Sequence, residues 1–371
     1  MFPEKSPLHR LADHGQSVWI DYLSRDLIRT GELERLMRDD AVVGVTSNPT
    51  IFQKAISQGS AYDDQLRACV EEVDDDKEIF LRLTRDDVAE ACQLLRPVWD
   101  GGGGQDGYVS WEVDPSLAYD RDATIEEARR LHGLVDRPNL FVKIPATEPG
   151  LGAIEEMIAS GKNINVTLIF SLERYRAVVE AYLRGLERLV ADGGDPRRVA
   201  SVASFFVSRV DTEADKRLEA IGGRALELRG KLAVANAKLA YQHYKQVFSG
   251  ERWEALAAKG ASKQRCLWAS TSTKNPEYRD VLYVEELIGP ETVNTMPQET
   301  IEAFQDHGRV APTLEQGIDE AKQLFEELAA IGVDYDDVVQ TLEREGVEKF
   351  SDSFAELLDG IRAKRGELVS A

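Results

Sequence analysis

The sequence predicts a parallel α/β protein in which eight strand–helix units follow one another along the chain. Two observations support this fold class. Short segments rich in Val, Ile, Phe and Trp alternate with longer segments whose apolar residues recur at helical spacing. The alternation repeats eight times, which favours closure of the sheet into a barrel. An open, doubly wound sheet is the structural alternative, because periodicity alone does not prove closure.

Eight segments are predicted as strands because β-branched and aromatic residues dominate them. They are residues 17–21, 41–47, 108–114, 140–146, 164–170, 199–208, 265–271 and 292–296. The clearest helix between two strands covers residues 172–190, where apolar residues recur every three to four positions and Ser171 is a suitable N-cap. The pattern therefore predicts a (β/α)8 barrel of the TIM type.

Additional helices lengthen this pattern at three places. We expect a short helix over residues 7–16 across the barrel end, a mostly helical insert at about 211–263 between the sixth and seventh strands, and two or three C-terminal helices at about 313–366. None of these segments contains a low-complexity linker. We therefore predict that residues 1–371 form a single domain.

Composition excludes several classes of protein. Of the 371 residues, 43% are hydrophobic and 30% charged, which is enough apolar material for a large core and excludes wholesale disorder. The formal net charge is −21, so the surface repels nucleic-acid backbones and anionic lipids. We expect no nucleic-acid partner and no membrane partner, although this charge is compatible with a local basic pocket for a small anion. The sequence predicts no particular oligomeric state.

Cysteine and histidine give no sign of a disulfide framework or a metal site. Cys69, Cys92 and Cys266 are odd in number and widely spaced, and the five histidines do not cluster. The N-terminus lacks the apolar core of a signal peptide, and no apolar run reaches the ~18 residues of a membrane span. We therefore predict a soluble cytoplasmic protein without a histidine- or cysteine-based metal site.

Two short motifs are discounted. Residues 102–107 match the G-x-G-x-x-G pattern, but they follow a helical segment and precede a strand, the reverse of a dinucleotide-binding fingerprint. We interpret them as a flexible loop. Residues 165–167 match a glycosylation sequon, but they lie inside a predicted strand, so we interpret the match as a coincidence.

Polar side chains lie at the C-terminal ends of seven of the eight predicted strands, where α/β barrels have their active sites. The candidates are Asp21, Asn48, Glu112, Lys143, Asn165, Thr167, Ser204, Arg209, Ser270 and Lys274. Their convergence from so many strands favours a common site over separate solvated surfaces.

Lys143 is the most informative candidate because it interrupts the apolar strand LFVKIPA. Burial disfavours a charged ammonium, and a neutral amine can attack a carbonyl carbon to form a Schiff base. The alternative is a lysine that reaches the barrel mouth or pairs with a carboxylate such as Glu112. The availability of Asp21 and Glu112 as proton carriers favours the catalytic interpretation.

The other candidates have both a functional and a structural interpretation. Asn48, Asn165 and Thr167 can hold sugar hydroxyls or a water, or they can satisfy backbone groups at turns and strand ends. Arg209 and Lys274, together with the hydroxyl of Ser204, can form a phosphate-binding cradle, or the two cations can form ordinary ion pairs. Ser270 lies near the end of the seventh predicted strand, shortly before Lys274, and is a further candidate for the same binding site.

Several motifs, in the same order along the chain, resemble those of the transaldolase family in its longer bacterial form. They are GVTSNPTIF, VSWEVDPSLAYD, LFVKIPAT, INVTLIFSLERY, ASFFVSRVD, WASTSTKNPEY and ETVNTMP. The resemblance covers most of the chain. It implies a (β/α)8 barrel and a cofactor-free Schiff-base enzyme of the non-oxidative pentose phosphate pathway.

The resemblance also implies a role for each candidate at its own position. Lys143 matches the Schiff-base lysine, and Asp21 matches the aspartate that takes the proton of the C4 hydroxyl. Glu112 matches the glutamate that acts through a water, which Thr167 helps to hold. The remaining matches are Asn48 and Asn165, which contact the sugar, and Ser204 and Arg209, which bind phosphate.

The substrates implied are sugar phosphates. A dihydroxyacetone unit would pass from sedoheptulose 7-phosphate or fructose 6-phosphate to glyceraldehyde 3-phosphate or erythrose 4-phosphate. One departure affects the phosphate site. Many members have an arginine in a pattern like A-S-F-R-N after the seventh strand, whereas this chain has a segment two residues longer with Lys274 instead. Lysine supplies charge but not the bidentate fork of arginine.

Three alternatives stay open at this point. A simple aldolase would release free dihydroxyacetone, and water access to the enamine would decide between it and a transferase. A noncatalytic sugar-phosphate-binding barrel would use Lys143 only as an anion contact. A pyridoxal-phosphate lyase also uses a Schiff-base lysine, and an absorbance band would reveal its cofactor.

Overall fold

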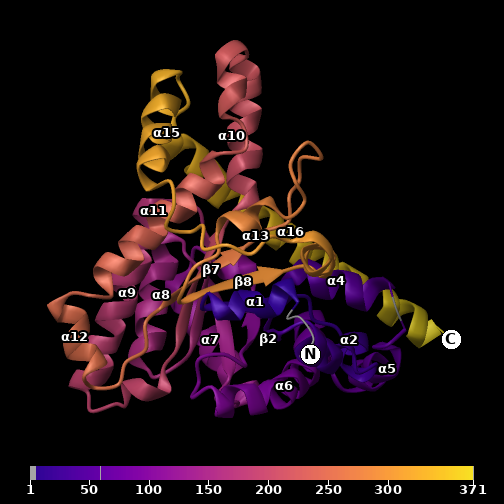
Figure 1. Cartoon of the computed structure of the whole chain (residues 1–371). Coiled ribbons are helices and arrows are strands. Elements are labelled where there is room, and N and C mark those ends of the chain that lie inside the picture. The colour runs from indigo at the N-terminus through magenta and orange to yellow at the C-terminus, as the bar shows by residue number, and fades with distance from the viewer. Residues whose placement is uncertain (1–5, 59, 371) are drawn as a thin grey trace, which may run out of the picture.

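The computed structural model describes residues 6–58 and 60–370 and contains a closed barrel of eight parallel strands (Figure 1). The strands are β1 (Gln16–Asp21), β2 (Val42–Thr46), β3 (Val109–Glu112), β4 (Leu140–Pro145), β5 (Ile164–Ile169), β6 (Ser201–Phe206), β7 (Arg265–Ala269) and β8 (Thr292–Met296). Each strand pairs with the next in sequence, and β8 closes onto β1. The predicted (β/α)8 barrel is confirmed, and the open-sheet alternative is excluded.

Helices surround the barrel. They are α1 (Pro7–Asp13), α2 (Arg25–Arg29), α3 (Glu32–Asp39), α4 (Pro49–Gln58), α5 (Asp63–Glu72), α6 (Asp76–Gly101), α7 (Arg121–Val135), α8 (Glu148–Ala159), α9 (Leu172–Ala191), α10 (Ser208–Ile221), α11 (Leu232–Val247), α12 (Glu251–Ala257), α13 (Leu282–Glu286), α14 (Gln298–His307), α15 (Ile318–Ala330) and α16 (Tyr335–Ser370). Ser171 caps α9 as predicted, because its Oγ accepts a hydrogen bond from the backbone N–H of Arg174.

The helices outside the eightfold repeat lie where the sequence predicts them. The N-terminal helix α1 contacts β1 and α14, and it ends at Asp13 rather than at residue 16. Between β6 and β7 the chain forms α10, α11 and α12, and after β8 it forms α15 and α16 in addition to α14. The far ends of α10 and α15 project beyond the barrel (Figure 1).

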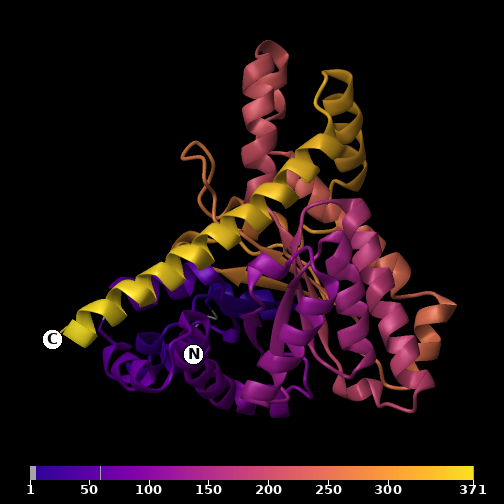
Figure 2. The same ribbon diagram turned by 180° about the vertical axis from the view of Figure 1, so that it is seen from behind.

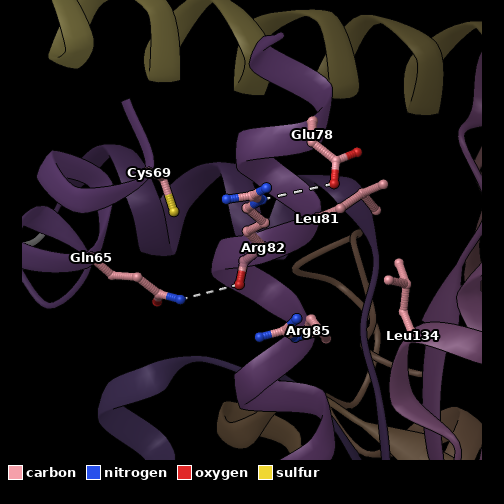
Figure 3. Close-up of a pocket in the computed structure, with 7 residues that line it drawn as sticks. All are labelled: Gln65, Cys69, Glu78, Leu81, Arg82, Arg85 and Leu134. Carbon is pink, nitrogen blue, oxygen red and sulfur yellow. Dashed lines mark hydrogen bonds and ion pairs between the residues drawn. The ribbon is translucent and has the colours of Figure 1, made fainter. Parts of the chain in front are cut away.

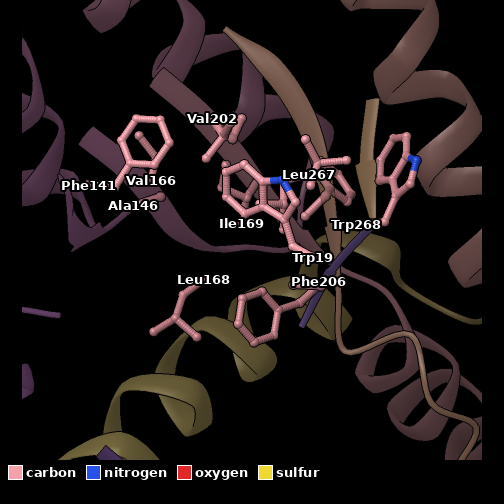
Figure 4. Packing of buried hydrophobic residues seen from close by; sticks show 14 of the residues in the cluster. Trp19, Phe141, Ala146, Val166, Leu168, Ile169, Val202, Phe206, Leu267 and Trp268 are labelled. Atoms are coloured by element: carbon pink, nitrogen blue, oxygen red, sulfur yellow. The ribbon is translucent and has the colours of Figure 1, made fainter. Parts of the chain in front are cut away.

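Large apolar side chains fill the barrel (Figure 4). Trp19 and Phe141 are buried, and their ring centroids lie 6.1 Å apart. Gly44 in β2 makes room for this packing, since a Cβ atom there would lie 2.5 Å from the ring of Trp19. Alanine at this position would therefore force the tryptophan out of place.

The glycine-rich segment 102–107 contacts β1 and β7 through Asp106. It follows α6 and precedes β3, as predicted for a loop with no dinucleotide-binding geometry. The C-terminal end of the segment is anchored to β1, because the carboxylate of Asp106 accepts hydrogen bonds from Ser17 Oγ at 2.7 Å and from Trp19 Nε1 at 2.9 Å. The guanidinium of Arg265 pairs with the same carboxylate at 3.0 Å. The segment thus ties α6 to the base of β1 and β7.

The C-terminal helix α16 runs across the molecule from the side of α10 and α15 towards α4 and α5 (Figure 2). It contacts α4, α6, α10 and the barrel strand β5. Leu168 and Phe206, at the ends of β5 and β6, face this helix (Figure 4). A helix from the last part of the chain therefore covers one side of the barrel mouth.

Candidate active site

The polar ends of the strands surround a cavity of about 660 Å³ at the barrel mouth. Eight of the ten predicted site residues line it: Asp21, Asn48, Lys143, Thr167, Ser204, Arg209, Ser270 and Lys274. The other two, Glu112 and Asn165, do not line the cavity but contact residues that do. The structure therefore brings all ten candidates together.

Lys143 is a buried lysine held by two oxygen acceptors. Its side chain is only 6% exposed, and its Nζ lies 3.1 Å from Glu112 Oε2 and donates to the carbonyl of Ser47 at 3.0 Å. Strand pairing explains the first contact, because Glu112 of β3 stands directly beside Lys143 of β4. The amine thus has a carboxylate next to it that can take or return a proton.

Asp21 lies at the end of β1, where Thr46 of β2 is its neighbour in register. The hydroxyl of Thr46 donates to Asp21 Oδ1 at 2.7 Å, and it also lies 2.7 Å from the hydroxyl of Thr295. This hydroxyl pair orients the carboxylate at the cavity wall. Asp21 and Lys143 therefore line the same cavity.

The environment raises the pKa of both carboxyl groups. Burial in the barrel mouth is the main cause for the raised pKa of Asp21, and the positive charges of Lys143 and Arg209 oppose it. Burial likewise raises the pKa of Glu112, against the nearby ammonium of Lys143. Carboxyl groups with raised pKa values can both accept and donate protons nearer to neutral pH.

Asn165 forms a hydrogen-bonded bridge inside the barrel. Its amide donates to Ser110 Oγ at 3.0 Å, and its Oδ1 accepts a hydrogen bond from Ser204 Oγ at 2.7 Å. Asn165 and Ser204 are both almost fully buried. The hydroxyl of Ser204 lines the cavity, but its proton is directed to Asn165 and not to the space where the sequence predicted a phosphate.

The side chains of Thr167 and Asn48 differ in their hydrogen bonding. The hydroxyl of Thr167 is buried and has no hydrogen-bond partner among the described residues, so it is available to a ligand or a water. Asn48 accepts a hydrogen bond from the backbone N–H of Ile51 at 3.1 Å and so caps α4. The structural interpretation of Asn48 is therefore correct, but the side chain lines the cavity as well.

Arg209 is the second residue of α10, and its guanidinium lies near two aromatic rings. Its guanidinium carbon is 5.0 Å from the ring centroid of Phe206 and 5.5 Å from that of Phe350. Burial lowers its pKa, and the charges of Asp21 and Glu112 partly offset this effect. The rings fix the plane of the guanidinium and leave its N–H groups available to an anion.

The segment after β7 is strained. Ser270 has a φ of 54°, which is uncommon for a residue other than glycine, and its hydroxyl lies 2.9 Å from that of Ser208. Lys274 Nζ donates a hydrogen bond to Ser272 Oγ at 2.7 Å, and Lys274 also lines the cavity. The segment thus supplies hydroxyl groups and one cation at the rim.

Several polar lining residues were not among the predicted site residues, including Thr46, Thr295, Lys54 and Lys349. Thr295 lies at the end of β8, so the rule that strand ends form the site could have found it. Lys54 and Lys349 lie on α4 and α16 and carry no such signal. They reach the site only because these helices pack over the barrel mouth.

A second, smaller cavity lies between α5 and α6, away from the strand ends (Figure 3). Its charged side chains are paired with one another or with neighbours. Arg82 pairs with Glu72 at 2.8 Å, and Arg85 pairs with Asp86 at 2.8 Å. This cavity therefore offers no free charged group like those at the barrel mouth.

Within residues 6–58 and 60–370, no group of three or more His, Cys, Asp or Glu side chains is arranged to hold a metal ion. Every helix within these ranges is either too short or too polar to span a lipid bilayer.

Comparison with known proteins agrees with the geometry. The sequence model described as "Transaldolase/Fructose-6-phosphate aldolase" matches residues 18–361. Proteins named transaldolase are similar over almost their whole length. The one from Frankia alni is 54% identical, covering 97% of this chain and 98% of the relative; that from Acidothermus cellulolyticus is 55% identical, covering 97% and 99%. The transaldolase of Mycolicibacterium paratuberculosis is 53% identical and covers 99% of both chains. This chain belongs to the transaldolase/fructose-6-phosphate aldolase family.

Proposed function

We propose that this protein transfers a dihydroxyacetone unit between sugar phosphates through a Schiff base on Lys143. The donor is sedoheptulose 7-phosphate or fructose 6-phosphate, and the acceptor is glyceraldehyde 3-phosphate or erythrose 4-phosphate, as in the non-oxidative pentose phosphate pathway. The observation that carries the proposal is the buried amine of Lys143, 3.1 Å from Glu112 in a cavity that also contains Asp21 and Arg209. We also propose that the chain is one cytoplasmic domain.

Imine formation is the first step. The Nζ of Lys143 attacks C2 of the ketose after Glu112 takes an ammonium proton, and a proton passes from the attacking nitrogen to the former carbonyl oxygen, which becomes a hydroxyl. Glu112, through a water held by Thr167, then returns a proton to this hydroxyl, which leaves as water. The product is a protonated imine between Lys143 and C2.

Carbon–carbon cleavage follows. Asp21 takes the proton of the C4 hydroxyl, the C4–O bond becomes a carbonyl, and the C3–C4 bond breaks. Its electron pair moves into the protonated imine, which becomes an enamine that retains the three-carbon unit. The aldose phosphate leaves and a second one enters. The enamine then attacks its aldehyde carbon, and Asp21 returns the proton to the new alkoxide oxygen. Water hydrolyses the regenerated imine by the reverse of the first step, which releases the new ketose phosphate and frees Lys143.

The proposal is tested by borohydride trapping. The protein is mixed with fructose 6-phosphate, reduced, and analysed by intact mass and a peptide map. We expect a reduced three-carbon adduct on Lys143. An adduct on another lysine would contradict this site, and no adduct on a folded protein would favour the noncatalytic binding barrel. Addition of erythrose 4-phosphate then separates a transferase, which forms sedoheptulose 7-phosphate, from an aldolase, which releases dihydroxyacetone.

Replacement of Arg209 should affect phosphate binding specifically. We expect Arg209→Ala to raise KM for fructose 6-phosphate by about 10- to 100-fold, the size of one charged hydrogen-bonding contact. The rate with unphosphorylated fructose should change little. The matched control is Arg224→Ala, which removes an exposed arginine from the turn that follows α10 and does not line the cavity. An equal loss with fructose would remove the assignment of Arg209 to the phosphate.

The pH profile should move when the charge of Glu299 is removed. Asp21 must be deprotonated to accept a proton, so kcat/KM should fall as the pH falls through its raised pKa. The negative charge of Glu299, which also lines the cavity, contributes to that raised value. We therefore expect Glu299→Gln to shift the acid limb to lower pH with little change in the plateau rate. The measurement is the pH dependence of kcat/KM. An acid limb that stays in place, or that moves to higher pH, would contradict its assignment to Asp21.

A further inference from the structure

Four positively charged side chains from four separate segments line the same cavity. They are Lys54 of α4, Arg209 of α10, Lys274 after β7 and Lys349 of α16. In the ranges that the structure covers, none of the four lies within 4.0 Å of a carboxylate as an ion pair. This is unusual in a chain with a net charge of −21, where most other cationic groups at the surface have an acidic partner.

The carboxylates that line the cavity offset this group of cations only in part. Glu213, at the cavity wall, is paired with Arg217 at 2.9 Å and with Lys216 at 3.6 Å. Glu299 and Glu345 also line the cavity but form no ion pair with the four cations. The rim thus carries an excess of positive charge beside Arg209.

The packing of α16 places Lys349 at this rim. Gly346 allows the close approach of the helix, since a Cβ atom there would lie 3.2 Å from Leu168 and 3.4 Å from the ring of Phe170. Phe350, the residue after Lys349, contacts both Phe206 and the guanidinium of Arg209. Residues on either side of Lys349 are therefore fixed against the barrel mouth.

Like charges act on Lys349 directly. Its pKa is lowered, chiefly by the positive charge of Arg209, then by partial burial and by Lys274 and Lys54. Such repulsion is relieved when a group with two negative charges enters between the cations. A phosphate monoester has this charge and enough oxygens to contact several cations at once.

We propose that Lys349 binds the phosphate group of the sugar substrate together with Arg209, so that the C-terminal helix forms part of the substrate site. Lys54 and Lys274 complete the cluster. The inference rests on the proposed function and extends it. The proposal also explains why the segment after β7 can have Lys274 where many family members have an arginine. Lysine lacks the bidentate guanidinium of arginine, but α16 supplies a further cation.

The test uses Lys349→Gln at low ionic strength. We expect KM for fructose 6-phosphate to rise about tenfold, equivalent to about 1.4 kcal/mol, while kcat stays within about twofold. The inhibition constant of inorganic phosphate should rise by a similar factor. The rate with unphosphorylated fructose should not change, and Lys349→Arg should restore a KM close to that of the natural chain.

The matched control is Arg344→Gln, which removes the same charge from an exposed position of α16 that does not line the cavity. An unchanged KM and phosphate inhibition in Lys349→Gln would overturn the proposal. An equal rise in Arg344→Gln would also overturn it, because the effect would then reflect the overall charge of the helix. Borohydride trapping keeps the two questions apart. A Lys143 adduct in the unaltered protein supports the proposed function whatever Lys349 does, and binding of inorganic phosphate tests Lys349 even if no adduct forms.

Discussion

Lys143→Ala should abolish turnover while the protein stays folded. Without the amine no imine forms, so the electrons of the C3–C4 bond have no acceptor, and we expect kcat to fall by at least about 10⁴-fold. Glu112 would lose its partner, but burial already raises its pKa, so it can bind a proton instead of staying as an unpaired charge. Activity is measured by coupled assay, folding by circular dichroism, and adduct formation by mass.

Lys77→Ala provides the matched control. Lys77 is another partly buried lysine, with Asp114 at 2.9 Å and Glu127 at 3.1 Å, but it does not line the cavity. Its removal also breaks ion pairs, so it should lower thermal stability while each folded molecule keeps its activity. If Lys143→Ala retained a rate near that of the unaltered chain, the Schiff-base mechanism would be excluded.

Asp21→Asn should block cleavage without blocking imine formation. The amide cannot take the proton of the C4 hydroxyl, so we expect kcat to fall by about 10²- to 10⁴-fold, the usual contribution of a general base. The amide can still accept the hydrogen bond that Thr46 now donates at 2.7 Å, so the local structure should be kept.

Borohydride trapping distinguishes this loss from a structural one. In Asp21→Asn the ketose should stay intact on Lys143, so the reduced adduct should have the mass of the whole fructose 6-phosphate skeleton. The unaltered chain should give the three-carbon adduct. A three-carbon adduct formed at the normal rate in Asp21→Asn would show that another group takes the proton.

Much of the fold could be predicted from local patterns. The eight strands coincide with the segments rich in β-branched and aromatic residues, and α9 begins at its predicted cap. The order of a helix, then the glycine-rich segment, then β3 was enough to exclude a dinucleotide-binding motif. These predictions hold because side-chain periodicity and capping depend on neighbours in the sequence.

The candidate site was predictable to the extent that it is built from strand ends. Lys143, Asp21 and Thr167 could be proposed because the carboxyl ends of parallel strands meet at one edge of a barrel. The same rule could have added Thr295. The double role of Asn48, which caps α4 and lines the cavity, could not be read from its position before Pro49.

The sequence by itself determined the type and order of the elements, the placing of a lysine in an apolar strand, and the gathering of polar residues at strand ends. Only the tertiary structure decided that the sheet closes, that Asn165 bridges Ser110 and Ser204, and that α16 lies across the barrel mouth with Lys349 beside Arg209. The physical reason is that local patterns specify how each segment folds and which face it buries. Contacts between segments far apart in the chain depend on how those faces pack together.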